Sequence, residues 1–76
     1  MLKELIEHIV KTLVDNPAVV VVTVAVEDGK TAIQVTVGDT DLGRVIGKDG
    51  QTIRAIRSLA LAVAPEGHDV TVDVSK

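Results

Sequence analysis

Hydrophobic residues at the start of the chain recur with the period of an α-helix. They follow the spacing i, i+3, i+4, i+7, i+8, i+11, i+12, as Leu2, Leu5, Ile6, Ile9, Val10, Leu13 and Val14. This stripe predicts an amphipathic helix with one face against a core. The helix is expected to end at Asp15-Asn16-Pro17, because proline cannot continue the hydrogen-bond ladder and pushes the preceding residue out of the α region. A strand is expected to follow directly.

Three later segments have the patterns of β-strands. Ala18 to Val26 is rich in β-branched residues, and Thr31 to Val37 alternates apolar and polar positions. Glu27-Asp28-Gly29-Lys30 predicts a turn between them, so these two segments are expected to form an antiparallel hairpin. A last strand is predicted where valines at 70, 72 and 74 alternate with polar residues.

Two helices are predicted between the hairpin and the last strand. Gly38-Asp39-Thr40-Asp41 offers N-cap residues before a short segment, Leu42 to Ile46. Gly47-Lys48-Asp49-Gly50 then interrupts the helical pattern before a longer helix, Gln51 to Ala64. Pro65-Glu66-Gly67 is expected to stop the second helix.

The predicted element order is therefore α-β-β-α-α-β. Strands joined by a helical crossover lie parallel with a right-handed connection, so the sheet is expected to be three-stranded and mixed. Three helices can cover one face of it, which gives a two-layer α+β fold. The 76 residues are enough for one domain only, residues 1–76.

Composition narrows the class of protein. The chain has no cysteine for a disulfide or a thiolate metal site, and His8 and His68 are more simply explained as solvated histidines than as metal ligands. The N-terminus lacks the pattern of a signal peptide, and no apolar run approaches the ~18 residues of a membrane span. No nucleophile with a base and an orienting acid is recognisable. We therefore expect a cytoplasmic protein that is not an enzyme, with no cofactor, no metal and no membrane contact.

Positive charge is concentrated in one part of an acidic chain. The net charge is −3, but Leu42 to Ser58 carries +3 and the remainder −6. A local basic footprint is typical of proteins that bind phosphate backbones. The alternative is a solvated helix face, which is the usual meaning of a charge run.

The glycines beside this basic segment favour the first interpretation. Gly47 and Gly50 stand at a junction between helices, where a missing Cβ lets another backbone approach closely. An anion can also sit against the N-terminus of the helix that follows. By itself Gly-x-x-Gly is equally explained by a helix C-cap followed by an N-cap. A P-loop is excluded, because Gly43-x-x-x-Gly47-Lys48 lacks one spacer residue and Asp49 replaces the Ser or Thr that would bind magnesium.

The flanks of these glycines resemble a known family. Gly43-Arg44-Val45-Ile46-Gly47-Lys48-Asp49-Gly50-Gln51-Thr52-Ile53 resembles the signature of KH domains, with Val-Ile-Gly-x-x-Gly-x-x-Ile intact. The element order resembles that of type II KH domains, and over nearly the whole chain the sequence is similar to small bacterial single-KH RNA-binding proteins of the KhpA type. The resemblance implies an RNA chaperone or post-transcriptional regulator that binds short single-stranded RNA and, more weakly, single-stranded DNA. It also implies a homodimer and a larger KH-containing partner protein.

The resemblance assigns a role to each matching position. Gly47, Lys48, Asp49 and Gly50 would clamp the backbone of about four nucleotides. Arg44 and Lys48 would neutralise phosphates, and Arg54 would contact a base or a phosphate. Val45, Ile46 and Ile53 would line an aliphatic groove for bases. Gly43 would leave space for the strand to pass. Lys48→Asp is expected to reduce RNA binding, and Lys30→Asp in the hairpin turn to leave it unchanged.

Other features keep two alternatives open. Asp49 places a carboxylate where phosphates should approach, and the chain has no aromatic residue on which a base could stack. Val19 to Val22 is apolar on both faces of a strand expected at the sheet edge, which suits a protein-protein interaction or dimerisation module. The Val- and Ala-rich composition also suits a designed or reconstructed scaffold with weak or no RNA binding.

Overall fold

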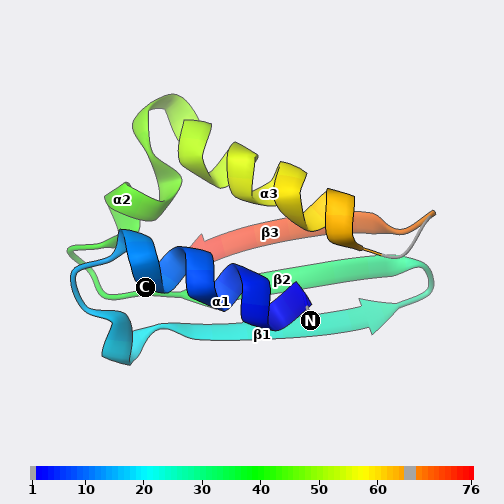
Figure 1. Ribbon diagram of the computed structural model, residues 1–76, viewed down its shortest axis with the longest axis horizontal. Coiled ribbons are helices and arrows are strands. Elements are labelled where there is room, and N and C mark those ends of the chain that lie inside the picture. Colours follow the sequence, from blue (N-terminus) through cyan, green and yellow to red (C-terminus); the bar gives the residue numbers. More distant parts are fainter. Residues whose placement is uncertain (1, 65–66) are drawn as a thin grey trace.

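The polypeptide forms a layer of helices against a three-stranded sheet (Figure 1). The computed structural model describes residues 2–64 and 67–76. In chain order the elements are helix α1 (Leu2–Leu13), 3₁₀ turn η1 (Pro17–Val19), strands β1 (Val21–Glu27) and β2 (Lys30–Thr36), helix α2 (Leu42–Ile46), 3₁₀ turn η2 (Lys48–Gly50), helix α3 (Gln51–Val63) and strand β3 (Asp69–Ser75). The predicted order α-β-β-α-α-β is confirmed.

The sheet is mixed, as predicted, and β2 lies at its centre. Strand β1 pairs with β2 antiparallel, and β3 pairs with β2 in parallel. The register places Val24, Ile33 and Val72 in one row across the three strands. Both outer strands, β1 and β3, are therefore edges of this sheet.

The core lies between the sheet and the helices. In Figure 1, α1 and α3 lie over the same face of the sheet, whereas the short α2 sits at its end. The buried apolar side chains come from the three helices, from the two strands of the hairpin and from the residues that flank them; they are Ile6, Val10, Val14, Val20, Val22, Ile33, Val35, Val37, Val45, Ile56 and Ala60. The helix layer predicted over one face is confirmed, with α2 at its margin.

The first strand begins later than the sequence pattern predicts. A 3₁₀ turn occupies Pro17–Val19, and the strand starts at Val21 rather than at Ala18. Proline at the first position of a helical turn has a suitable φ and needs no amide partner, so it favours the turn. Val20 and Val22 are buried while Val19 and Val21 are 43% and 54% exposed. The valine run is therefore apolar on both sides, as predicted, with one side buried in the core and the other exposed.

The end of α3 follows from the sequence. The helix ends at Val63, and Ala64 is extended with φ −64 and ψ 156. Ala64 precedes a proline, and the residue before proline avoids the α region. Two of the three predicted stop residues, Pro65 and Glu66, lie outside the described residues.

Asp41 has a different role from the predicted N-cap. It stands at the N-cap position of α2, but its carboxylate makes no cap hydrogen bond to that helix. Instead, Asp41 Oδ1 accepts from the amide of Asp15 at 3.0 Å, and Oδ2 accepts from the amide of Asn16 at 3.1 Å. These amides follow the last turn of α1, so the side chain joins the end of α1 to the start of α2.

Candidate nucleic-acid interface

The loop between α2 and α3 has a backbone conformation that its glycines allow. Gly47 has φ 79 and ψ 171, and Gly50 has φ 74 and ψ 16. Asp49, between them, has φ 55 and ψ 24. Positive φ is open to glycine and is tolerated by aspartate more readily than by most other residues. The residue types in this loop therefore match its shape.

Gly47 is needed for space as well as for conformation. A Cβ at this position would lie 2.3 Å from Thr52 Oγ1 and 2.9 Å from the Thr52 amide nitrogen. A Cβ at Gly50 would have Ile53 Cγ2 as its nearest atom, at 3.9 Å, which is an ordinary contact. The loop thus packs tightly against the first turn of α3 at Gly47 only.

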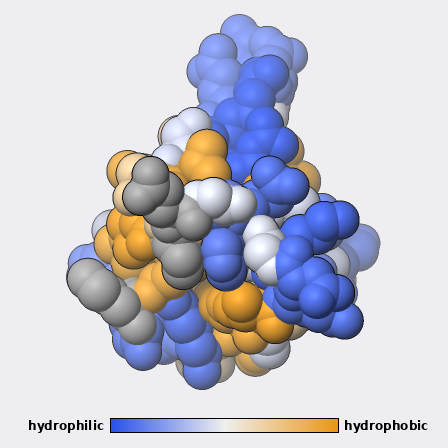
Figure 2. All heavy atoms as spheres, turned by 90° about the vertical axis from the view of Figure 1, so that its right-hand side faces the viewer, coloured by the Kyte–Doolittle hydropathy of each residue, from blue (hydrophilic) through white to orange (hydrophobic). Residues whose placement is uncertain are grey.

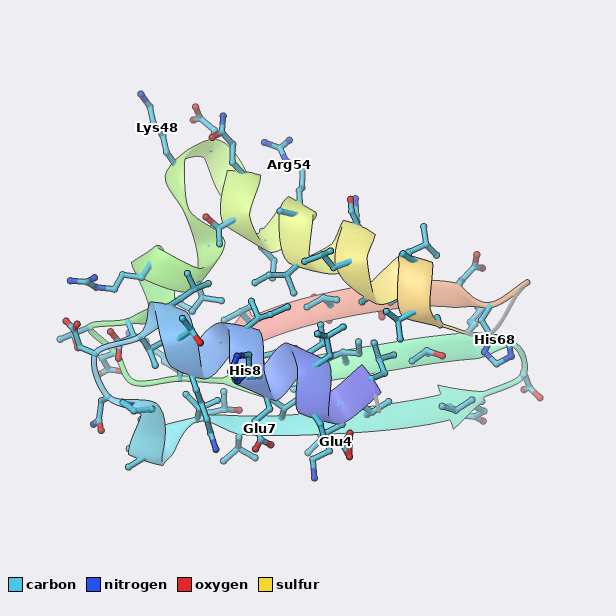
Figure 3. The ribbon with its side chains drawn as sticks, in the orientation of Figure 1. Glu4, Glu7, His8, Lys48, Arg54 and His68 are labelled. Carbon is cyan, nitrogen blue, oxygen red and sulfur yellow. The ribbon has the colours of Figure 1, made fainter. Side chains whose placement is uncertain are left out.

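Two cationic side chains stand at the exposed end of the molecule that carries the loop. Lys48 and Arg54 both project outward there (Figure 3). The Arg54 guanidinium donates to the carbonyl oxygen of Asp49, which ties α3 to the loop. This bond uses one of the five N–H groups of the guanidinium. Figure 2 shows hydrophilic residues covering this upper part of the molecule.

Arg44 lies beside two carboxylates, and its side chain is 56% exposed. Its Nη2 atom lies 3.2 Å from Asp15 Oδ2, and its Nε atom lies 3.8 Å from Asp41 Oδ1. These carboxylates belong to the junction of α1 and α2. The positive charge of Arg44 therefore lies next to the buried carboxylate of Asp41, whereas Lys48 and Arg54 lie at the loop.

Of the residues implied to form the aliphatic groove, one lies in the core and two lie at the surface. Val45 is fully buried in the core, so its side chain supports α2 and does not line a surface groove. Ile46 is 36% exposed, and Ile53 is partly exposed. A Cβ on Gly43 would meet no atom within 4 Å, so the space implied at this glycine exists.

A depression beside the start of α3 adds two residues that had no implied role, Arg57 and Val72, to Ile53 and Arg54. Ile53, Arg54, Arg57 and Val72 line a depression of about 120 Å³ between α3 and β3. Arg57 could have been found from its spacing, because residues i and i+3 share one side of a helix and Arg54 precedes it by three. Val72 could not, because only the sheet order places β3 at the edge beside α3.

Neither a candidate metal site nor a membrane-spanning helix is found in residues 2–64 and 67–76. In this part of the chain no group of three or more His, Cys, Asp or Glu side chains is placed to hold a metal ion. None of the helices described is long and apolar enough to cross a membrane.

A mixed three-stranded sheet with helices on one face and a Gly-x-x-Gly loop between two of them is the arrangement of a type II KH domain. Comparison with protein families agrees with this class: the family described as KhpA/KhpB, KH domain, matches residues 3–75. The chain belongs to this family.

Similar proteins are found in several bacteria. The chain is 38% identical to the RNA-binding protein KhpA of Thermotoga maritima, with 96% of this chain and 97% of the relative aligned. It is 40% identical to the protein of that name from Oceanobacillus iheyensis, over 88% and 89% of the two chains. For the Listeria monocytogenes protein of the same name the identity is 47%, over 82% of each chain. No solved structure matches the chain significantly.

Proposed function

We propose that this protein binds short single-stranded RNA at the Gly47–Gly50 loop and in the groove between α3 and β3. The observation that carries the proposal is the loop itself. It is held in a glycine-dependent conformation, it carries Lys48 with Arg54 beside it, and the helix that follows it borders a depression lined by Ile53, Arg54, Arg57 and Val72. The relatives named as RNA-binding proteins support the same ligand.

Each part of this surface suits a different part of a nucleotide. Lys48 and Arg54 supply positive charge for phosphates, and the glycines let the sugar-phosphate backbone approach the loop closely. Ile53 and Val72 offer aliphatic contacts to bases in place of the aromatic rings that many single-strand binders use. Asp49 opposes Lys48 in charge, so the affinity is expected to depend strongly on the remaining cations.

We propose that the chain works as a single domain, residues 1–76, in the cytoplasm. Its role would be that of an RNA chaperone or post-transcriptional regulator, which binds RNA and catalyses no reaction on it. Single-stranded DNA would bind the same surface more weakly, because it lacks the 2′-hydroxyl groups that RNA offers.

Lys48→Asp is expected to reduce affinity for a labelled single-stranded RNA by about tenfold or more at low salt. The variant replaces a cation by an anion where phosphates should bind, so it should also make binding less dependent on salt. Fluorescence anisotropy titrations at two salt concentrations measure both effects. Circular dichroism should show an unchanged fold, because Lys48 is exposed.

Lys3→Asp is the matched control for this variant. It makes the same change of charge at an exposed position in the first turn of α1, where an acidic side chain is favourable to the helix. RNA binding should stay at the wild-type level. An equal loss in both variants would show that only net charge matters, and the loop would then not be the site.

We also propose that the protein forms homodimers through the free edge of β1, with a larger KH-containing protein as a second partner. Val21 and Val26 on this strand are 54% and 63% exposed, and Val21–Val26 has no proline or charged residue to discourage strand pairing.

Val21→Lys is expected to weaken self-association measured by sedimentation equilibrium, with a shift of the monomer-dimer midpoint to at least about tenfold higher concentration. Ala62→Lys, an exposed position on α3, is the comparison. If only Ala62→Lys dissociates the dimer, the interface lies on the helices. A wild-type protein that stays monomeric at high concentration would contradict the proposal.

A further inference from the structure

Two short turns of this chain place the same pair of residues in the same backbone region. Asp28 and Gly29 in the β1-β2 turn have φ of 48 and 76, and Asp49 and Gly50 in the loop have φ of 55 and 74. Positive φ at two central residues is the mark of a type I′ turn, for which Asp-Gly is a favoured pair. A left-handed conformation is unfavourable for aspartate and persists where the surrounding structure holds it.

The surroundings that hold the two turns differ. In the hairpin, the residues on either side of the turn are paired partners in the sheet, so the ladder of β1 and β2 closes the turn. The loop joins two helices instead. Within it, the Gly50 amide donates to the carbonyl oxygen of Gly47 at 3.1 Å, and the Gln51 amide donates to the carbonyl oxygen of Lys48. These bonds close the loop locally, and its position on α3 needs a further contact.

Arg54 provides a contact of this kind. Its guanidinium donates to the carbonyl oxygen of Asp49, whereas the carbonyls of the two preceding residues accept from backbone amides. The guanidinium extends from α3, a helix that the core fixes through the buried side chains of Ile56 and Ala60. The left-handed residue of the loop is therefore attached to a rigid part of the fold. The planar guanidinium has five N–H groups in a fixed arrangement, which suits it to hold one carbonyl in place.

We infer that Arg54 is a positioning residue of the clamp, because its bond to the Asp49 carbonyl keeps the turn in the shape that presents Lys48 to RNA phosphates. The inference rests on the proposed function, since it needs RNA at the loop. Lys48 directly precedes Asp49, so a turn that opens at Asp49 also moves the Lys48 side chain. Arg54 therefore contributes more than its own positive charge, and its removal also weakens the contribution of Lys48.

A double-mutant cycle of Arg54→Met and Lys48→Met measures this dependence. Methionine has a long unbranched side chain without a charge or an N–H donor. Fluorescence anisotropy with a labelled four-nucleotide RNA should show about tenfold weaker binding for Arg54→Met and about fivefold for Lys48→Met. The double variant should bind about tenfold to twentyfold more weakly than the wild type, because Lys48 is already displaced when Arg54 is absent. Independent losses would multiply to about fiftyfold, and that result would overturn the inference.

Amide hydrogen exchange of the free protein tests the same role without RNA. In Arg54→Met, the amides of Gly50 and Gln51 should exchange at least about fivefold faster, because the turn that they close opens more often. In Lys48→Met, both amides should exchange at the wild-type rate. The Tm of Arg54→Met should stay within about 3 °C of the wild type, since Arg54 is exposed. The faster exchange would then report the loop alone and not the whole fold.

Arg57→Met is the matched control for Arg54→Met. It makes the same replacement about one turn further along α3, so it should leave the exchange of the Gly50 and Gln51 amides unchanged. Equal exchange of these amides in Arg54→Met and the wild type would overturn the inference and leave the proposed function intact. A wild-type protein that binds no RNA would overturn the proposed function, and the inference with it.

Discussion

Replacing Asp41 by alanine is expected to lower the free energy of unfolding by about 3 kcal/mol, the largest loss of stability predicted for a polar side chain of this protein. Asp41 is 1% exposed, and both of its carboxylate oxygens accept amide hydrogen bonds from the chain that follows α1. Alanine would leave the amides of Asp15 and Asn16 without these acceptors. A domain of this size is stable by roughly 4 to 11 kcal/mol, so the change removes a large part of the total.

The guanidinium of Arg44 adds to this effect. It lies between Asp41 and Asp15, and it would keep only the exposed Asp15 as a partner in the variant. Thermal unfolding followed by circular dichroism should show a fall in Tm of about 15 °C. Asp41→Asn keeps one carboxamide oxygen as an acceptor, so it should lose less stability than Asp41→Ala.

Asp39→Ala is the control for Asp41→Ala. Asp39 is an exposed residue in the same connection between β2 and α2. Its removal should change the free energy of unfolding by less than about 0.5 kcal/mol, as is usual for surface positions. A loss for Asp41→Ala no greater than that of Asp39→Ala would show that the junction of α1 and α2 is held by its apolar contacts alone.

Asp41 also shows where prediction from the sequence ends. Periodicity and turn residues predict every helix and strand of the sheet in the right order, because these signals act between residues close together in the chain. The partner of a buried carboxylate depends on residues 25 or 26 positions away, here Asn16 and Asp15. From the sequence, Asp41 resembles a local N-cap, since Asp is a favoured residue at that position.

The candidate site likewise contains some residues that the sequence identifies and others that only the structure brings in. The glycines and Lys48 could be chosen from the sequence, because the residue types at one turn are enough to define a possible clamp. Arg57 and Val72 become part of the same depression only through tertiary packing, which brings α3 and β3 together. Arg44 is the converse case, because a basic residue beside the loop in sequence is paired with Asp15 and Asp41 in space.

The two ends of α2 therefore have separate anchors. At its start, Asp41 and Arg44 connect the helix to the end of α1. At its end, the backbone of Gly47 packs against Thr52 in the first turn of α3. A five-residue helix has little stability by itself, so these contacts decide where the loop is held. The contact between Gly47 and Thr52 can be tested by a substitution at Gly47.

Gly47→Ala is expected to reduce RNA affinity by about tenfold or more and the free energy of unfolding by about 2 kcal/mol. Its φ of 79 and ψ of 171 lie in a region that is open to glycine almost alone. The added Cβ would also overlap the Thr52 side chain and approach the Thr52 amide nitrogen to 2.9 Å. The loop must move away from α3 to relieve both conflicts, which weakens the hydrogen bond from Arg54 to the Asp49 carbonyl and displaces Lys48. Fluorescence anisotropy with a labelled four-nucleotide RNA, the length that a KH domain holds, and chemical denaturation measure the two losses.

Gly29→Ala separates backbone strain from displacement of the loop. Gly29 also has a positive φ, of 76, but a Cβ there would meet no atom within 4 Å. This variant should lose about 1 kcal/mol of stability through its φ alone and should bind the four-nucleotide RNA as the wild type does. Thr52→Gly in the Gly47→Ala background removes the overlapping side chain but not the amide, so it should restore only part of the affinity. If Gly47→Ala binds RNA with wild-type affinity, the packing of Gly47 on Thr52 does not position the clamp, and Lys48 and Arg54 act independently of the loop's shape.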